Sequence, residues 1–226
     1  MKILISFSLL LINLFSSNTC YSQVKTDQDY IIDMGLTFFY DNSPKDLVGS
    51  SYIDKYFHNA KISIDGTIYS TRYDAYQDEM EIEKDNHKFY LRKTFNYTAT
   101  FLETNKVYQV YNYEDKDQVR TGFFVVLFNG DKVSLLMKER IRFFEEVIAT
   151  SGYDKYQPPT LKRVKDKLYI GYKNNETKEL PKKKNEILKL FSNKSKNIET
   201  FAKENNVGFK NKDDLTKIFT YYHTLK

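Results

Sequence analysis

Cysteine is almost absent from this chain of 226 residues, which has a single one, Cys20, and no tryptophan. A single cysteine cannot close an intramolecular disulfide or supply a cysteine-rich zinc site or an iron–sulfur cluster, so these devices are excluded. Glycine, proline and histidine are also scarce, at 8, 4 and 3 residues. The glycine-rich phosphate loops and nucleophile elbows of several enzyme classes do not occur. The fold must therefore be stabilised by its hydrophobic core alone.

Long hydrophobic runs are missing too, except for one near the N-terminus. A short basic start is followed by the apolar run Ile3 to Phe15 and then by a polar segment. The run is short for a membrane span and has the form of a secretory signal peptide. We predict that residues 1–22 are this signal and that cleavage after Ser22 leaves a periplasmic protein without cysteine. The alternative is a surface lipoprotein anchored through Cys20, but Ser-Asn-Thr precedes this residue instead of the usual leucine-containing signal.

Positive charge is in small excess and is unevenly distributed. The formal net charge is +5, carried by 29 lysines and only 6 arginines against 30 acidic residues. The segment from Leu180 to Lys226 holds 11 lysines and 5 acidic residues, a net charge of +6. Without Lys2 the total is +4, so Gln23 to Glu179 carries −2. A basic C-terminal segment thus follows a nearly neutral body. Export, scarce arginine and the lack of a binding motif argue against nucleic acid as a partner.

Strand signals dominate from about Lys61 to Tyr172. The tripeptides at Ile64–Gly66 and Asn129–Asp131 are typical of hairpin turns. Segments rich in Tyr, Phe, Thr, Ile and Val indicate strands between and after these turns. These strands are expected over Thr67–Tyr76, Glu79–Lys84, Lys88–Lys93, Tyr97–Leu102, Lys106–Tyr113, Arg120–Phe128 and Lys132–Arg140.

The strand Arg120–Phe128 (RTGFFVVLF) is apolar on both faces and is expected to be the most buried. A last hairpin is expected to pair Thr160–Val164 with Leu168–Tyr172 around the polar triplet between them. Successive short strands with local turns predict an α+β, mainly β fold. The β-rich body, residues 23–179, would be an antiparallel meander that closes as a sandwich, a barrel or a strongly curled sheet.

The periodicity changes at Pro181. Three short amphipathic helices are predicted in residues 180–226, as a basic cap whose helices pack on the sheet or on one another. Ser195 is expected to cap the second helix, and Asn211 with Asp214 resembles a capping box before the third. The third helix carries an apolar stripe with helical spacing, made of Leu215, Ile218, Phe219, Tyr222 and Leu225.

Acidic side chains recur from Asp74 to Asp85 and raise the question of a catalytic or cation site. In a strand, Glu79, Glu81 and Glu83 share one face, and the next strand presents Lys88, Tyr90 and Arg92. We therefore interpret the glutamates as a solvated charge ladder on the outside of a hairpin. Arg72 is expected to pair with Asp74 or Asp78 where the strand bends.

No catalytic, cofactor-binding or metal-ligating residue is predicted, and the protein is not expected to be an enzyme. His58, His87 and His223 are far apart in sequence and lack metal-ligand spacing. The acidic loop at Asp115-Lys116-Asp117 lacks the pattern of a calcium-binding loop.

Two sequence blocks carry a resemblance. GSSYIDKYFHNAKI (Gly49 to Ile62) and DGTIYSTRYDAYQDEMEIEKDN (Asp65 to Asn86) resemble exported proteins of Bacteroidota that share a Gly-Ser-x-Tyr stretch and an Arg-Tyr-(Asp/Asn)-x-Tyr-x-Asp-Glu-Met-Glu block. The resemblance implies a periplasmic or surface β-rich fold and brings no functional residues. It favours a non-enzymatic interaction protein that binds a protein partner in the envelope. Such a protein would be an accessory subunit of an outer-membrane or secretion complex, for example the plug of a type 9 secretion translocon, with peripheral outer-membrane association. The alternative is a glycan- or lipid-handling envelope enzyme or binding protein with its site at the open end of the sheet.

Overall fold

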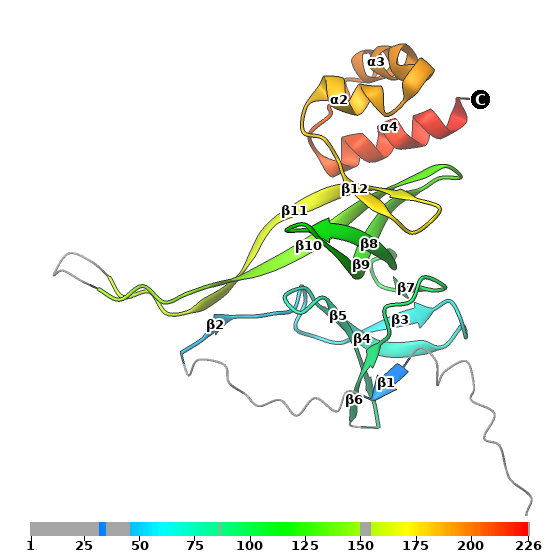
Figure 1. The fold of residues 1–226 in the computed structure, drawn as a ribbon. Coiled ribbons are helices and arrows are strands. Elements are labelled where there is room, and N and C mark those ends of the chain that lie inside the picture. Colours follow the sequence, from blue (N-terminus) through cyan, green and yellow to red (C-terminus); the bar gives the residue numbers. More distant parts are fainter. Residues whose placement is uncertain (1–31, 35–45, 86, 150–154, 226) are drawn as a thin grey trace, which may run out of the picture.

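The computed structural model describes residues 32–34, 46–85, 87–149 and 155–225 (Figure 1). The predicted signal peptide, its cleavage site and Cys20 lie outside these residues. The strands are β1 (Ile32–Met34), β2 (Val48–Gly49), β3 (His58–Ile62), β4 (Ile68–Asp74), β5 (Glu79–Lys84), β6 (His87–Leu91), β7 (Thr98–Phe101), β8 (Lys106–Asp115), β9 (Gln118–Asn129), β10 (Val133–Phe144), β11 (Thr160–Tyr172) and β12 (Thr177–Glu179). The helices are α2 (Lys184–Lys189), a 3₁₀ turn (Ser192–Lys194), α3 (Ser195–Glu204) and α4 (Lys212–Thr224).

The strands form one sheet in the order β1-β6-β5-β4-β3-β7-β8-β9-β10-β11-β12, with β2 added to β11. All neighbours along this path are antiparallel, and only β2 runs parallel to its partner. The sheet is strongly curled but, within the described residues, its pairing does not close into a barrel. A mainly β fold with short C-terminal helices is therefore confirmed.

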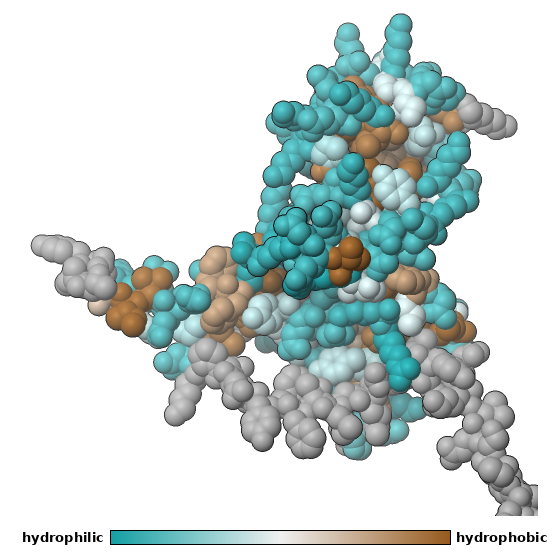
Figure 2. Space-filling view, viewed as in Figure 1, coloured by the Kyte–Doolittle hydropathy of each residue, from teal (hydrophilic) through white to brown (hydrophobic). Residues whose placement is uncertain are grey.

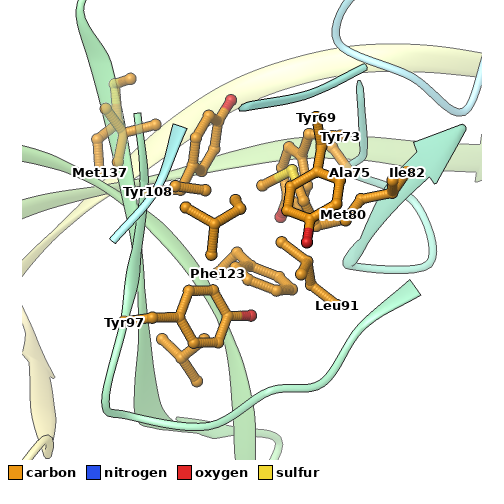
Figure 3. Packing of buried hydrophobic residues seen from close by; sticks show 14 of the residues in the cluster. Tyr69, Tyr73, Ala75, Met80, Ile82, Leu91, Tyr97, Tyr108, Phe123 and Met137 are labelled. Atoms are coloured by element: carbon orange, nitrogen blue, oxygen red, sulfur yellow. The ribbon is translucent and has the colours of Figure 1, made fainter. Parts of the chain in front are cut away.

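The largest core, called here the body core, lies where β4 and β5 fold over β8, β9 and β10. Figure 3 shows the rings of Tyr73, Tyr108 and Phe123 meeting Met80 and Leu91 across this space. Tyr73 and Tyr108 have ring centroids 5.0 Å apart, and Phe123 packs at 6.1 Å from Tyr73. The expected burial of β9 is confirmed for Phe123 and Phe124, which are 1% and 0% exposed and point to opposite faces.

The opposite face of β8 to β11 holds a smaller aromatic core of Tyr111, Phe124, Leu136 and Tyr169. Phe124 meets Tyr169 edge to face with centroids 5.1 Å apart. The start of β12 turns back to β8, where the amide of Asn112 donates a hydrogen bond to the carbonyl of Asn175 at 2.8 Å. The strands from β8 to β12 therefore curl around these rings.

The helices form a cap at one end of the sheet (Figure 1). Their buried side chains pack on Leu135 and Ile170 of the sheet and form the cap core with them. The capping box before α4 is confirmed, because the amide of Asp214 donates to the side-chain oxygen of Asn211 at 2.8 Å. Ser195 differs from expectation: it is the first residue of α3, and its hydroxyl donates to backbone carbonyls instead of capping.

One expected hairpin is wrong. Thr160 to Tyr172 is a single strand, β11, and it pairs with β10 over nearly its whole length. The register shifts between Lys138 and Arg140, where Glu139 of β10 faces both Lys165 and Asp166, so the polar triplet expected as a turn contains a β-bulge of β11. The real hairpin joins β10 to β11 and projects beyond the cores as a long arm, defined here as residues 142–149 and 155–162 (Figure 1).

Candidate functional site

Glu81 is buried, which corrects the interpretation of a solvated charge ladder. Only Glu83 faces Lys88 as expected, whereas Glu81 lies opposite Tyr90 and is 1% exposed. The guanidinium of Arg72, on the neighbouring strand β4, donates from Nε to Glu81 Oε2 at 2.7 Å. The sequence missed this pair because alternation predicts which side chains share a face but not which face is covered.

Arg72 contacts Glu81 and two aromatic rings, and the prediction that it pairs with Asp74 or Asp78 is wrong. The rings of Tyr52 and Phe57 lie 3.7 and 4.4 Å from the guanidinium carbon. The Tyr52 hydroxyl donates to Glu81 Oε1 at 2.9 Å, and burial with this contact raises the pKa of Tyr52. Both carboxylate oxygens of Glu81 are thus occupied, which leaves the group no role as a catalytic base.

Asp74 connects the sequence block from Gly49 to Ile62 with the block from Asp65 to Asn86. Its Oδ2 accepts from the Ser51 hydroxyl at 2.8 Å, and its Oδ1 accepts from the amides of Tyr76 and Gln77. Burial raises the pKa of Asp74 even though these hydrogen bonds favour the charged form. Because Ser51 belongs to the first block and Asp74 to the second, this contact gives both blocks a structural role.

A second, largely buried pair, Asp78 with Lys138, connects the β4–β5 turn to β10. Asp78 Oδ1 lies 2.6 Å from Lys138 Nζ and also accepts from the Tyr73 hydroxyl at 2.7 Å and the Phe123 amide at 3.1 Å. Gly122 makes room for the pair: a Cβ there would stand 2.0 Å from Asp78 Oδ2 and 2.6 Å from Lys138 Nζ. Burial lowers the pKa of Lys138, although Asp78 opposes this shift.

Glu139 forms a third buried group at the bulge. It is 2% exposed, accepts from the Tyr108 hydroxyl, and lies 3.1 Å from Lys106 Nζ and 2.9 Å from Arg163 Nη2. Burial, with the nearby Glu139 charge, raises the pKa of Tyr108. Alternation along β10 places the consecutive residues Lys138 and Glu139 on opposite faces of the strand, so each is part of a separate network.

A cavity of about 460 Å³ opens beside the Asp78–Lys138 pair, at the mouth of the curled β8 to β11 strands. Its walls come from the β4–β5 turn, the ends of β8 and β9, and the middle of β10 and β11. Burial raises the pKa of Tyr113 and of Tyr169, which line the cavity, to about 12, so both phenols are neutral near pH 7. Cationic residues are prominent among the others: Lys93, Arg120, Lys138, Arg140, Arg142 and Lys167.

The histidines are not brought together. His58 lies between Asp54 and Glu103, with its two nitrogens 3.1 and 2.8 Å from their carboxylates. His87 Nδ1 donates to the backbone carbonyl of Asp85 in its own turn, and His223 packs on Phe128 near the C-terminus. Across the described residues, no group of three or more His, Cys, Asp or Glu could hold a metal ion.

Sequence reasoning missed Lys138 and Glu139, although one signal was present. A glycine within an apolar strand often marks a place where another group approaches the backbone closely. Gly122 is such a glycine in β9, and the group that approaches it is the Asp78–Lys138 pair. Nothing in the sequence indicated the partner itself, because it lies 44 positions away in the β4–β5 turn.

Within the described residues, no helix is both long and apolar enough to cross a membrane. The chain matches no protein-family model, no curated protein and no solved structure.

Proposed function

We propose that this chain is a non-enzymatic interaction protein of the bacterial envelope, an accessory subunit that docks on a partner protein through its β10–β11 arm. The observation that carries the proposal is the exposure of apolar side chains along this arm. Val147, Ile148 and Tyr156 are 51%, 68% and 50% exposed, and Phe143 and Phe144 are 38% and 45% exposed. Figure 2 shows apolar surface near the far end of the arm.

The arm is an ordered element without a core of its own. Backbone hydrogen bonds join Val147 and Gln157 in both directions, at 2.9 and 3.0 Å. None of its five exposed apolar residues belongs to the body, cap or aromatic core. Gathered apolar side chains on a projecting element are typical of a protein-binding surface.

The backbone of the arm favours a partner that adds a strand. β10 pairs with β9 only from Ser134 to Met137, so its outer edge from Arg140 to Phe144 has no strand partner within the described residues. The first residues of β11 already pair with a parallel strand, β2. In β2, Gly49 has φ +97°, and a Cβ at this position would lie 2.0 Å from the carbonyl oxygen of Leu161. An extended segment of a partner could pair with β10 in the same manner.

The charges of the arm favour a protein over an anionic bilayer. Glu145 and Glu146 are exposed and stand between Phe144 and Val147. The arm also holds Arg142, Lys155 and Lys162, so its net charge is only +1, and a negatively charged lipid surface would gain little attraction from it. A protein groove can pair each charge individually.

A catalytic role has less support. Glu81 and Glu139 are buried, and both carboxylate oxygens of each accept from a donor. Asp78 Oδ1 is engaged by Lys138, by the Tyr73 hydroxyl and by the Phe123 amide. A general acid or base needs a proton site open to substrate. Such groups fit a structural role in a chain that has no disulfide.

The test is site-specific photo-crosslinking in the native host. A photoreactive residue at position 148 should give a discrete adduct of higher mass, whereas one at position 68 should not. Ile68 is a matched control, 54% exposed but on β4 away from the arm. The double variant Val147→Ser/Ile148→Ser should fold normally, because both side chains are already exposed, and should abolish an adduct formed from a photoreactive residue at position 144. Equal adducts at positions 148 and 68, or an unchanged adduct in the double variant, would refute arm docking.

A further inference from the structure

We infer that the cavity at the mouth of the curled β8 to β11 strands is a binding site for an anionic ligand of sugar size, such as a sugar acid or a sugar phosphate. The cavity shares Arg142 with the arm, but this inference rests on the cavity lining and not on the exposed apolar residues that carry the proposed docking role. Its volume of about 460 Å³ lies in the range of small-molecule sites, about 300–1,000 Å³. Its position at the open end of a curled sheet is also typical of such sites.

Arginine is concentrated at this cavity. The chain has only 6 arginines beside 29 lysines, yet Arg120, Arg140 and Arg142 all line it. A planar guanidinium can bind a carboxylate or phosphate through two parallel hydrogen bonds, which the point charge of a lysine cannot do. In a chain that otherwise uses lysine for solubility, three arginines around one cavity indicate oxyanion recognition.

Arg140 and Arg142 have no counter-ion among the described residues, so their charge can pair with a ligand. Arg120 lies 3.6 Å from Asp115, and the cavity lysines Lys93 and Lys167 are paired with Glu79 and Glu179. No carboxylate of the described residues forms an ion pair with Arg140 or Arg142. The one described hydrogen bond from the Arg140 side chain runs to the carbonyl of Lys165, at 3.4 Å. The positive charge that remains unpaired therefore lies on one wall of the cavity.

The floor is fixed in place and offers neutral donors. Lys138 lies beneath the cavity with its side chain 8% exposed, held by Asp78 and by a hydrogen bond from Nζ to the carbonyl of Phe123 at 2.9 Å. The rings of Tyr113 and Tyr169 pack on Phe124, which fixes their positions. Neither phenol has a hydrogen-bond partner for its hydroxyl within the described residues. The hydroxyls of Tyr113 and Tyr169 and the side-chain amide of Gln77 can form hydrogen bonds with the hydroxyl groups of a sugar.

The ligand class follows from these groups together. Guanidinium groups on one wall select an oxyanion, and the tyrosines and Gln77 select a polar ring that carries hydroxyls. A fatty acid or other lipid chain fits poorly, because charged and polar groups make up most of the lining. A neutral sugar would leave the arginines without a counter-charge.

The experiment is isothermal titration calorimetry on the full mature chain at low ionic strength, with D-glucuronate, D-glucose 6-phosphate, D-glucose and inorganic phosphate as separate probes. We expect saturable binding of at least one anionic sugar, no binding of glucose, and weaker binding of inorganic phosphate than of the sugar phosphate. A preference between the first two probes would distinguish a carboxylate ligand from a phosphate ligand. Binding should weaken as salt is added, since the recognition is ionic.

The variant Arg140→Gln/Arg142→Gln should lose at least about tenfold in affinity, because charge-assisted hydrogen bonds are the strong ones. The control Lys132→Gln/Lys217→Gln removes the same charge from exposed residues outside the cavity and should change affinity less than about twofold. Circular dichroism should show both variants folded. Unchanged binding in the arginine variant, an equal loss in the control, or no saturable binding of any anionic probe would overturn the site. Phosphate bound as tightly as the sugar phosphate would overturn the sugar component.

Discussion

Replacing Gly122 by alanine should disturb the buried Asp78–Lys138 pair. The new Cβ would stand 2.0 Å from Asp78 Oδ2 and 2.6 Å from Lys138 Nζ, far inside ordinary contact distance. The Asp78 carboxylate and the Lys138 ammonium must then shift, which disturbs the contacts of Asp78 Oδ1 with Lys138, with the Tyr73 hydroxyl and with the Phe123 amide. Complete breaking of a buried ion pair typically costs about 3–5 kcal/mol. Because both clashing atoms are side-chain ends, Gly122→Ala should lose stability by no more than this amount.

A double-mutant cycle isolates this cause. In the background Asp78→Ala/Lys138→Met the two clashing atoms are gone, and Gly122 has no positive φ that would make alanine strained. Alanine in a strand is otherwise favoured over glycine by about 0.5–1 kcal/mol. Gly122→Ala should therefore become neutral or slightly stabilising in this background, a reversal of sign. Urea unfolding followed by circular dichroism measures all four proteins. An equal loss of stability in both backgrounds would show that the glycine is required for another reason.

Three further predictions concern other parts of the molecule. Glu81→Gln should lower the free energy of unfolding by about 3–5 kcal/mol because it leaves the Arg72 guanidinium without its counter-ion. The control Glu83→Gln changes an exposed residue and should match the wild type in urea unfolding. Equal stability of the two variants would place Glu81 outside the core. His58 should titrate above its ordinary pKa in NMR, because its hydrogen bonds to Glu103 and Asp54 outweigh its partial burial. The stability that it adds should be complete below about pH 6.5, should disappear as pH rises through the raised pKa, and should be absent in His58→Gln; a pKa at or below the ordinary value would contradict the pairing. Phe219→Ala should cost about 3–5 kcal/mol in thermal or urea unfolding, since this ring is 1% exposed and packs between Phe128 and Phe191. The control Lys217→Ala, on the exposed side of α4, should cost little. A small loss of stability for Phe219→Ala would mean that the cap is loosely packed.

The strands and the cap could be predicted from sequence because their signals are local. Alternation of apolar residues gave β4 to β9 to within a few residues, and the Asn211–Asp214 pair marked the start of α4. The polar triplet from Lys165 to Lys167 was misread as a turn because it contains the β-bulge of β11, where Lys165 and Asp166 together face Glu139. Aspartate is common in turns, but here the long pairing with β10 overrides that local preference.

The candidate cavity could not be predicted, because its parts come from distant segments. Asp78, Arg120 and Lys138 are separated by tens of residues and meet only because the β4–β5 turn folds over β8 to β10. The apparent ladder at Glu79 to Glu83 has the same explanation, since burial of Glu81 depends on the approach of Tyr52 and Arg72. Arginine scarcity was visible in the composition, but its concentration in space was not.

The length of β10 gives the molecule a mechanical property. This single strand contributes Leu135 to the cap core, Lys138 to the cavity floor and Phe143 to the arm. The bulge between Lys138 and Arg140 prevents β10 from sliding against β11 by one residue without breaking the Glu139 network. A pull on the tip of the arm would therefore reach the helices as tension along one continuous strand. It would load the β9–β10 hydrogen bonds in shear, where several must break together instead of one after another.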